Sequence, residues 1–330
     1  MIQVGYHASH EQFKPSALLK LVQRAATAGF TAAMCSDHFH PWTEEQGESG
    51  FAWSWLGAAM QATPFTYGVV NAPGQRYHPA IIAQAAATLQ EMFPDRFWIA
   101  VGTGQAVNEH ITGTHFPMKE ERNARVKECV EVIRALWAGE TVNHIGRVIV
   151  ENAKLYTRPQ NPPLIVGAAI TEKTAAWVGS WADALITVSA PPEKLKKVVD
   201  AFRQGGGEGK PMYLKVQLSY DKDDKKALLG AHEQWRANIF ESALLTELQM
   251  PSQFDYAAKH VRPEDLHGFV RSSSSTDQHI EWLSKDIELG FSNVYLHNVN
   301  LQQAQFIDVF GEKVVPALTQ LNQPAASGKN

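Results

Sequence analysis

The sequence predicts a (β/α)8 barrel of the α/β class, interrupted by insertion segments. Short runs of apolar and β-branched residues alternate about eight times with amphipathic helical stretches, the pattern of parallel βα units. The length of 330 residues suits one such barrel with insertions. No Gly-x-Gly-x-x-Gly turn follows the first apolar run, which disfavours an open dinucleotide-binding sheet.

The first half of the chain contains four predicted strands, at residues 2–6, 31–35, 65–70 and 96–101. A helix follows the first strand, because Pro15 suits the first helical turn and Gly29 suits the position after the last. The polar, glycine-containing stretch 40–51 is expected to be a loop. Further helices are expected at 53–62, 79–92 and 119–138.

The second half contains the other four predicted strands, at residues 164–166, 184–188, 212–218 and 293–297. Helical patterns follow them at 171–181, 193–204, 277–289 and 301–321. The stretch 140–163 predicts a hairpin and a loop, and 221–275 a largely helical insertion. We therefore expect one barrel domain over residues 1–322 with insertions at about 40–62, 140–163 and 221–275, then a flexible tail at 323–330.

Composition narrows the class of protein. Hydrophobic residues make up 44% of the chain, which is enough for a large core, and the net charge of −4 gives no reason to expect nucleic acid or an anionic membrane as partner. The two cysteines, Cys35 and Cys129, rule out a disulfide scaffold. No signal peptide or membrane-length apolar run is visible, so we expect a soluble cytoplasmic protein.

Polar side chains follow most of the predicted strands, and in a barrel the active site forms at these carboxyl ends. The groups are at residues 7–11, 36–42, 71–77, 102–109, 189 and 297–298. Three interpretations compete. Asp37-His38-x-His40, with His7, resembles the spacing of a metal site, but the strands at 164–166, 184–188 and 212–218 add no ligand. A metal-dependent hydrolase is therefore the weaker alternative, and a non-catalytic barrel would leave this polar set incidental.

The third interpretation is a flavin-type site. Gly102-Thr103-Gly104 and Gly167-Ala168-Ala169 end two consecutive strands with small residues, so that backbone can lie close to a planar ring. Asp37, His38 and Asn108 can supply hydrogen bonds to such a ring. Either glycine turn alone would be explained by a tight loop, whereas the pair in a barrel favours a slot for a coenzyme.

Four motifs carry a resemblance to a known family. They are Ser-Asp-His-Phe-x-Pro-Trp at 36–42, Arg-Tyr-x-Pro-Ala at 76–80, Val-Gly-Thr-Gly-x-Ala-x-Asn-Glu at 101–109 and Leu-Trp-x-Gly at 136–139. The chain resembles the bacterial-luciferase-like superfamily from about residue 3 to about residue 320. Within it, the chain is most similar to the glucose-6-phosphate dehydrogenases that use the deazaflavin coenzyme F-420. The resemblance implies a luciferase-like barrel, and by analogy a homodimer.

The resemblance also implies the site residues. The catalytic set is His38, Asp37, Gln105, Glu11 and Trp42. The residues implied to bind the coenzyme are Asp37, His38, Val70, Asn71, Ala72, Gly102, Thr103, Gly104, Gln105, Asn108, Ala168, Ala169 and Ile170. In this family the stretch matching Val70-Asn71-Ala72 forms a bulge with a non-prolyl cis peptide under the ring. No metal is implied.

The departures from this branch shape the functional prediction. Gln105 stands where the branch has a proton-transferring Glu, and Gln cannot titrate. Residues 188–192 lack the phosphate-binding lysine, Tyr256 replaces a second one, and Val70-Asn71 stand where a Ser is usual. We therefore expect FMN as coenzyme and a monooxygenase or reductase acting on a small organic, non-phosphorylated substrate. A flavin reductase or NAD(P)H would supply the electrons. The alternative is a coenzyme F-420-dependent dehydrogenase or reductase.

Several residues have simpler explanations. His7, His10, His110 and His115 are expected to be solvated loop histidines, and Cys35 a small buried apolar residue. The tryptophans at 53 and 55 are expected to serve helix packing more than the substrate wall.

Overall fold

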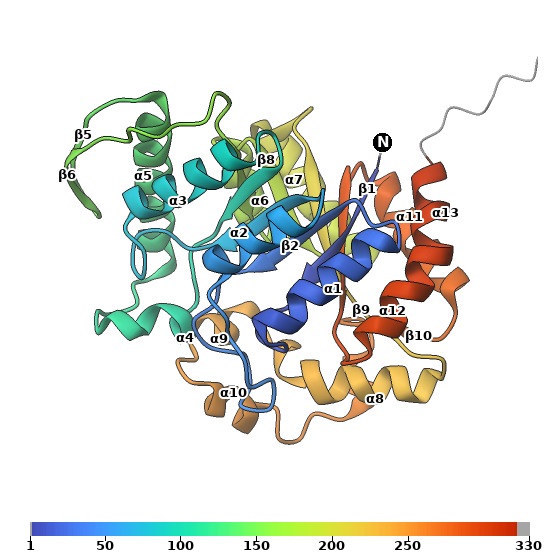
Figure 1. Ribbon diagram of the computed structural model, residues 1–330. Helices are drawn as coiled ribbons and strands as arrows, with labels where there is room; N and C mark the ends of the chain where they lie inside the picture. Colours follow the sequence, from blue (N-terminus) through green and yellow to red (C-terminus); the bar gives the residue numbers. More distant parts are fainter. Residues whose placement is uncertain (1, 322–330) are drawn as a thin grey trace, which may run out of the picture.

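Eight parallel strands close into a barrel in the computed structural model, which describes residues 2–321 (Figure 1). The barrel strands are β1 (Gln3–Ala8), β2 (Ala32–Ser36), β3 (Thr66–Asn71), β4 (Phe97–Val101), β7 (Leu164–Ala168), β8 (Ala184–Val188), β9 (Met212–Tyr220) and β11 (Asn293–Asn298). Closure is complete because β9 pairs with both β8 and β11, and β11 pairs with β1. The short β10 (Arg271–Ser273) extends the sheet at the end of β9. The predicted (β/α)8 barrel is therefore confirmed.

Helices surround the barrel in the order that the sequence predicts. They are α1 (Pro15–Thr27), α2 (Ala52–Ala62), α3 (Pro79–Met92), α5 (Lys119–Ala138), α6 (Glu172–Gly179), α7 (Pro192–Phe202), α11 (Thr276–Glu288), α12 (Gln303–Val309) and α13 (Val315–Gln320). Two π-turns, Arg203–Gly207 and Phe310–Val314, continue α7 and join α12 to α13. Proline occupies the first turn of α1, α3 and α7, where its missing N–H costs nothing.

The first predicted insertion is shorter than expected. Residues 40–62 were expected to be inserted together, but Ala52–Ala62 forms α2, which packs between α1 and α3 as the regular helix after β2. Only the loop before it departs from the βα pattern. The hydrophobic face of α2, with Trp53 and Trp55 both buried, explains why this helix belongs to the outer ring.

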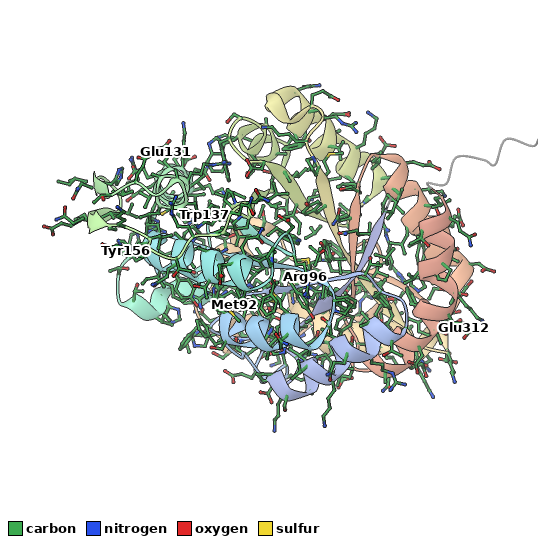
Figure 2. The ribbon with its side chains drawn as sticks, turned by 45° about the horizontal axis from the view of Figure 1, so that its top comes forward. Met92, Arg96, Glu131, Trp137, Tyr156 and Glu312 are labelled. Atoms are coloured by element: carbon green, nitrogen blue, oxygen red, sulfur yellow. The ribbon has the colours of Figure 1, made fainter. Side chains whose placement is uncertain are left out.

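Two other segments leave the barrel. The hairpin of β5 (Val142–Ile145) and β6 (Ile149–Ala153) projects beyond α5, and Tyr156 lies near it at the outer edge (Figures 1 and 2). Trp137 lies nearer the barrel, where its indole N–H donates to the Ala83 carbonyl at 2.9 Å.

The segment after β9 covers one end of the barrel. It contains α8 (Asp224–Trp235), α9 (Ser242–Glu247) and α10 (Pro251–Ala257), with 3-10 turns at Arg236–Asn238 and Pro263–Leu266. These helices gather with α4 (Ala106–Glu109) below the strands in Figure 1, and a 3-10 turn, His110–Thr112, follows α4. Because these elements follow the carboxyl ends of β4 and β9, they lie on the side where barrel active sites form.

The amino-terminal half of the barrel interior is filled by aromatic rings. Trp98, Tyr213 and Tyr295 contact one another, with ring centroids 5.2 to 6.3 Å apart, and the Trp98 indole N–H donates to the Tyr295 hydroxyl at 3.2 Å. Two glycines make room for these rings. A Cβ at Gly68 would lie 1.9 Å from the Trp98 ring, and one at Gly5 would lie 2.3 Å from the Tyr295 ring. We call these three rings the aromatic plug.

Within residues 2–321, no helix is both long and apolar enough to cross a membrane. The predicted tail at 323–330 lies outside the described residues.

Candidate functional site

The carboxyl ends of β1 and β2 bring together an acid and a histidine. His38 Nδ1 lies 2.7 Å from Glu11 Oε1, and the Ser9 hydroxyl donates to Glu11 Oε2 at 2.9 Å. Burial alone would raise the pKa of Glu11, but the adjacent His38 outweighs burial and holds that pKa below its ordinary range. Glu11 is therefore ionised and faces His38 Nδ1, which leaves Nε2 of that ring for a ligand.

Aromatic residues enclose this pair. The Trp42 ring meets the His38 ring edge-to-face, with centroids 5.1 Å apart, and also packs 5.5 Å from Phe254 of α10. Phe254 is fully buried, so α10 is firmly attached to this end of the barrel. The side chain of Gln46 accepts from the Trp42 backbone N–H at 3.0 Å and holds the loop in place.

Asp37 takes a different direction from its neighbour His38. The Trp53 indole N–H donates to Asp37 Oδ2 at 3.0 Å, and the Arg76 guanidinium lies 3.5 Å from the same oxygen. Glu109 Oε2 accepts from the Arg76 backbone N–H at 2.9 Å, so one arginine lies between two acids. Burial raises the pKa of both carboxyls, although Arg76 opposes it. Asp37 Oδ1 is buried without a hydrogen-bond partner and can accept one from a ligand.

The residues predicted to hold the coenzyme ring lie at the ends of three adjacent strands. β3, β4 and β7 are neighbours in the barrel, and the Gly102 backbone N–H donates to the Asn71 carbonyl at 2.9 Å. A Cβ at Gly102 would lie 3.6 Å from the Ala168 Cβ, and one at Gly104 would lie 3.2 Å from the Ala72 Cβ. Val70 and Gln105 are half-buried beside them. Gly102, Gly104, Ala72 and Ala168 form a surface of small residues at these strand ends, which we call the small-residue surface.

The expected bulge and cis peptide after β3 are wrong. Val70 and Asn71 continue β3 in regular register with β4, and no cis peptide bond occurs in residues 2–321. The Asn71 side chain explains the regularity, because its amide donates to the Ala100 carbonyl at 3.0 Å across the two strands. Asn71 Oδ1 remains buried without a partner.

Two other predicted residues, Asn108 and Thr103, are placed by specific contacts. Asn108 Oδ1 accepts from the backbone N–H groups of Phe39 and His40, so this side chain orients the loop that carries His38, while its Nδ2 stays unpartnered. Thr103 Oγ1 accepts from Lys119 at 2.9 Å. Beyond Ala168 the chain leaves the surface: Ala169 is buried and Ile170 is 43% exposed.

The histidines expected to be solvated include two that are not. His7 and His10 are buried, which corrects that expectation. β1 runs to Ala8, so His7 is a strand residue on the same face as Gly5, and this face lines the barrel. The His7 ring packs 4.3 Å from the His297 ring of β11, and burial lowers the pKa of both well below its usual value.

The sequence interpretation noted His297 only as one of the polar groups at a strand end, and it missed Lys215 and Trp235 at this end of the barrel. The sequence does carry a signal for Lys215. In a strand, alternate side chains point to opposite faces, and Lys215 stands between Leu214 and Val216, which are both buried. This alternation indicates which face of β9 carries Lys215, but it does not indicate that this face lines a site.

The spacing Asp37-His38-x-His40 does not gather metal ligands. His38 contacts Glu11 and Asp37 contacts Trp53, while His40 Nδ1 lies 2.7 Å from the Val107 carbonyl. Across residues 2–321, no three His, Cys, Asp or Glu side chains are arranged to hold a metal ion.

Comparisons with known proteins agree with this barrel. The sequence model of the luciferase-like monooxygenase family matches residues 1–293. The chain is 32% identical to the F-420-dependent glucose-6-phosphate dehydrogenase of Beutenbergia cavernae, over 96% of this chain and 98% of that protein. It is 33% identical to the enzyme of the same name from Nakamurella multipartita, over 97% of each.

A solved structure shares both fold and sequence. An F-420-dependent secondary alcohol dehydrogenase, in complex with an adduct of F-420 and acetone, superposes with a TM-score of 0.90 at 30% identity. The match covers 96% of this chain and 99% of that one. The chain therefore belongs to the luciferase-like monooxygenase family of oxidoreductases.

Proposed function

We propose that the protein is a coenzyme F-420-dependent dehydrogenase or reductase that interconverts a small, non-phosphorylated alcohol and its carbonyl compound. The observation that carries the proposal is the His38–Glu11 pair, 2.7 Å apart beside the small-residue surface. A base at hydrogen-bond reach of a bound hydroxyl, next to a surface that accepts a planar ring, is what alcohol oxidation requires.

The residues present fit such a ring. The small-residue surface lets the ring lie against backbone, and unpartnered buried atoms border it: Asp37 Oδ1, Asn71 Oδ1 and Asn108 Nδ2. Two acceptors and one donor suit a heterocycle that carries both N–H groups and carbonyls. A bound deazaflavin would supply the site that takes or gives the hydride of the substrate carbon.

The relatives support the deazaflavin rather than the FMN that we expected from the sequence. That expectation depended on Gln105, Tyr256 and residues 188–192, and also on Val70-Asn71 at the end of β3. The first three bear on proton transfer and phosphate binding, so they inform the choice of substrate and not the choice between two planar coenzymes. Val70 and Asn71 continue β3 in regular register with β4 and add no group that distinguishes the two rings. The glucose-6-phosphate dehydrogenases and the secondary alcohol dehydrogenase named above are F-420-dependent.

His38 and Glu11 carry the proton chemistry in this proposal. As the C–H bond of the alcohol breaks with its electron pair, the hydroxyl proton moves to His38 Nε2 and the C=O bond forms. Ionised Glu11, against Nδ1, stabilises the imidazolium that results. Gln105 can hydrogen-bond to the oxygen but can neither donate nor accept a proton in the step.

The absent phosphate cations argue for a substrate without a phosphate group. No cation lies in residues 188–192, and Tyr256 is 80% exposed on α10, away from the buried pair. A phosphate dianion needs charge-assisted bonds that these positions do not provide.

Titration of the purified chain with F-420 and with FMN tests the coenzyme. We expect saturable binding of F-420 and binding of FMN at least about tenfold weaker, measured by fluorescence. Tight FMN binding with none of F-420 would overturn the proposal in favour of flavin chemistry.

Replacement of the base tests the chemistry. His38→Ala should lower kcat for alcohol oxidation about 10²- to 10⁴-fold while F-420 still binds, because general-base catalysis has this magnitude. His115→Ala, at an exposed histidine, is the matched control and should leave kcat unchanged. Equal kcat values in the His38→Ala variant and the unaltered enzyme would exclude His38 as the base.

A further inference from the structure

Lys215 is the inner cation at the carboxyl end of the barrel. Its neighbours Leu214 and Val216 are fully buried in the core between the barrel and its helices. Because side chains alternate between the two faces of a strand, Lys215 points to the inside of the barrel. In register it lies beside Tyr295 of the aromatic plug on one side and beside Val188 on the other. The stem therefore starts at the plug, and the ammonium lies 5.5 Å from the centre of the Trp235 ring of α8.

No carboxylate in the described part of the chain pairs with this ammonium. Among the ion pairs and side-chain hydrogen bonds within residues 2–321, none involves Lys215. The acid whose charge acts on it is Glu11, and both Glu11 oxygens are already engaged, by His38 and by Ser9. His7 and His297 also face Lys215, but burial keeps both neutral at physiological pH, so neither carries charge of its own.

A second donor accompanies the lysine. Gln217 lies two residues further along β9, on the same face and nearer the mouth, and is only 7% exposed. Ser189 donates to Gln217 Oε1 at 2.8 Å, which commits the amide oxygen and leaves the Nε2 hydrogens for another acceptor. A single ammonium next to an amide N–H matches the two oxygens of a carboxylate.

A half-buried ammonium without a counter-ion is costly, because the charge loses water and gains no partner. We propose that Lys215, with Gln217, binds the carboxylate of the substrate, so that the substrate class is hydroxy acids and their oxo-acid products. This inference rests on the proposed function and names its substrate. The carboxylate would lie at the inner end, against Trp235, and the reacting carbon nearer His38.

The arrangement favours a carboxylate over the other anions. Lys215 is one cation, and its neighbours Trp235, His7 and His297 add none, so the charge matches a monoanion and not a phosphate dianion. Both Glu11 oxygens are occupied by His38 and Ser9, so this acid does not pair directly with the ammonium.

The test compares oxo acids with their methyl esters, which have similar shape but no charge. Pyruvate, 4-oxopentanoate and benzoylformate, each with its ester, are titrated calorimetrically into the full chain with and without oxidised F-420. We expect at least one acid to bind at least about 10-fold tighter than its ester, and Lys215→Met to reduce this acid-to-ester ratio to about 1. Lys194→Met, at an exposed lysine of α7, is the matched control and should keep the ratio.

Three outcomes would overturn the proposal: esters that bind as well as acids, a ratio that survives Lys215→Met, or no binding by any compound in the set. Circular dichroism and thermal melting establish that the Lys215→Met variant is folded, and Lys215→Arg should retain part of the ratio because it keeps the charge. Failure of the proposed function would be seen separately, because the chain would then not bind F-420. The titrations without coenzyme do not depend on F-420 and test Lys215 alone.

Discussion

The two halves of the barrel interior differ in whether their buried polar atoms have hydrogen-bond partners. At the amino-terminal end, the aromatic plug is closed, which means that the polar atoms of Trp98 and Tyr295 are paired and the rings are tightly packed. The Tyr295 hydroxyl accepts from Trp98 and from Asn293, and Gly5 and Gly68 leave just enough room for the rings. At the carboxyl end, His7 Nδ1 and His297 Nδ1 are buried without partners. A closed half stabilises the fold, whereas unpaired polar atoms lower stability and are retained where a ligand can satisfy them.

The largest effect should come from breaking the closed half. Gly68→Ala places a Cβ 1.9 Å from the Trp98 ring, and overpacking of a rigid core should lower the free energy of unfolding by about 3 kcal/mol. Chemical denaturation measures this. Gly57→Ala in α2 meets nothing within 4 Å and should instead stabilise by about 0.5 kcal/mol. Equal stabilities of the two variants would show that the plug is not tightly packed.

Two buried histidines, His10 at the open half of the barrel and His279 on the outer helix α11, should make the fold sensitive to acid. Burial lowers the pKa of His10 and of His279 to about 4. Each residue therefore binds a proton in the unfolded chain, below about pH 6.5, before it does so in the folded chain. Stability should be fully present above pH 6.5 and be lost between pH 6.5 and 4, by about 1–2 kcal/mol per histidine at pH 5.

Denaturation at pH 7.5 and at pH 5 measures this loss. His10 and His279 together cause part of the loss of unfolding free energy between pH 7.5 and pH 5, and His10→Phe should remove about half of that part. The Phe ring does not titrate, and it can keep the edge-to-face contact with Trp55. An identical pH dependence in the variant would mean that His10 is not the source.

A smaller effect is expected from the acid behind the proposed base. Glu11→Gln removes the charge that stabilises protonated His38, and we expect kcat to fall about tenfold with little change in F-420 affinity. Ser9→Ala removes only the hydrogen bond to Glu11 Oε2 and should cost about two- to threefold. Steady-state kinetics with both variants ranks the two contacts, and a larger loss for Ser9→Ala would contradict this order.

The charge of Lys215 should give a pH dependence of its own. Burial lowers its pKa to about 8, although Glu11 acts in the other direction, and His7 and His297 are its other titratable neighbours. The ammonium is present below this pH, so the preference for oxo acids over esters should weaken as the pH rises above about 8. Calorimetry at pH 7 and 9 measures the change, and Lys215→Met should abolish it.

Local pattern was enough for the order of strands and helices. The run at 184–188 is apolar and β-branched, and β8 has these bounds. The ends of the strands were harder to predict from the sequence. The first strand was expected to end at residue 6, but β1 extends to Ala8 because Ala8 pairs with Cys35 of β2. Residues 53–62 were recognised as a helix, but their place in the outer ring was not, since it depends on contacts with α1 and α3.

Sequence alone determined the fold class, the family resemblance and the strand ends at which polar groups collect. These follow from short-range period and from motifs of a few residues. Only the tertiary structure decided which of those groups meet. Asp37 and His38 are adjacent but belong to different networks, while His297 and Gln12, 285 positions apart, lie within 3.1 Å. The reason is barrel closure, which places β11 beside β1, so the inward face of each strand acquires neighbours that no local pattern contains.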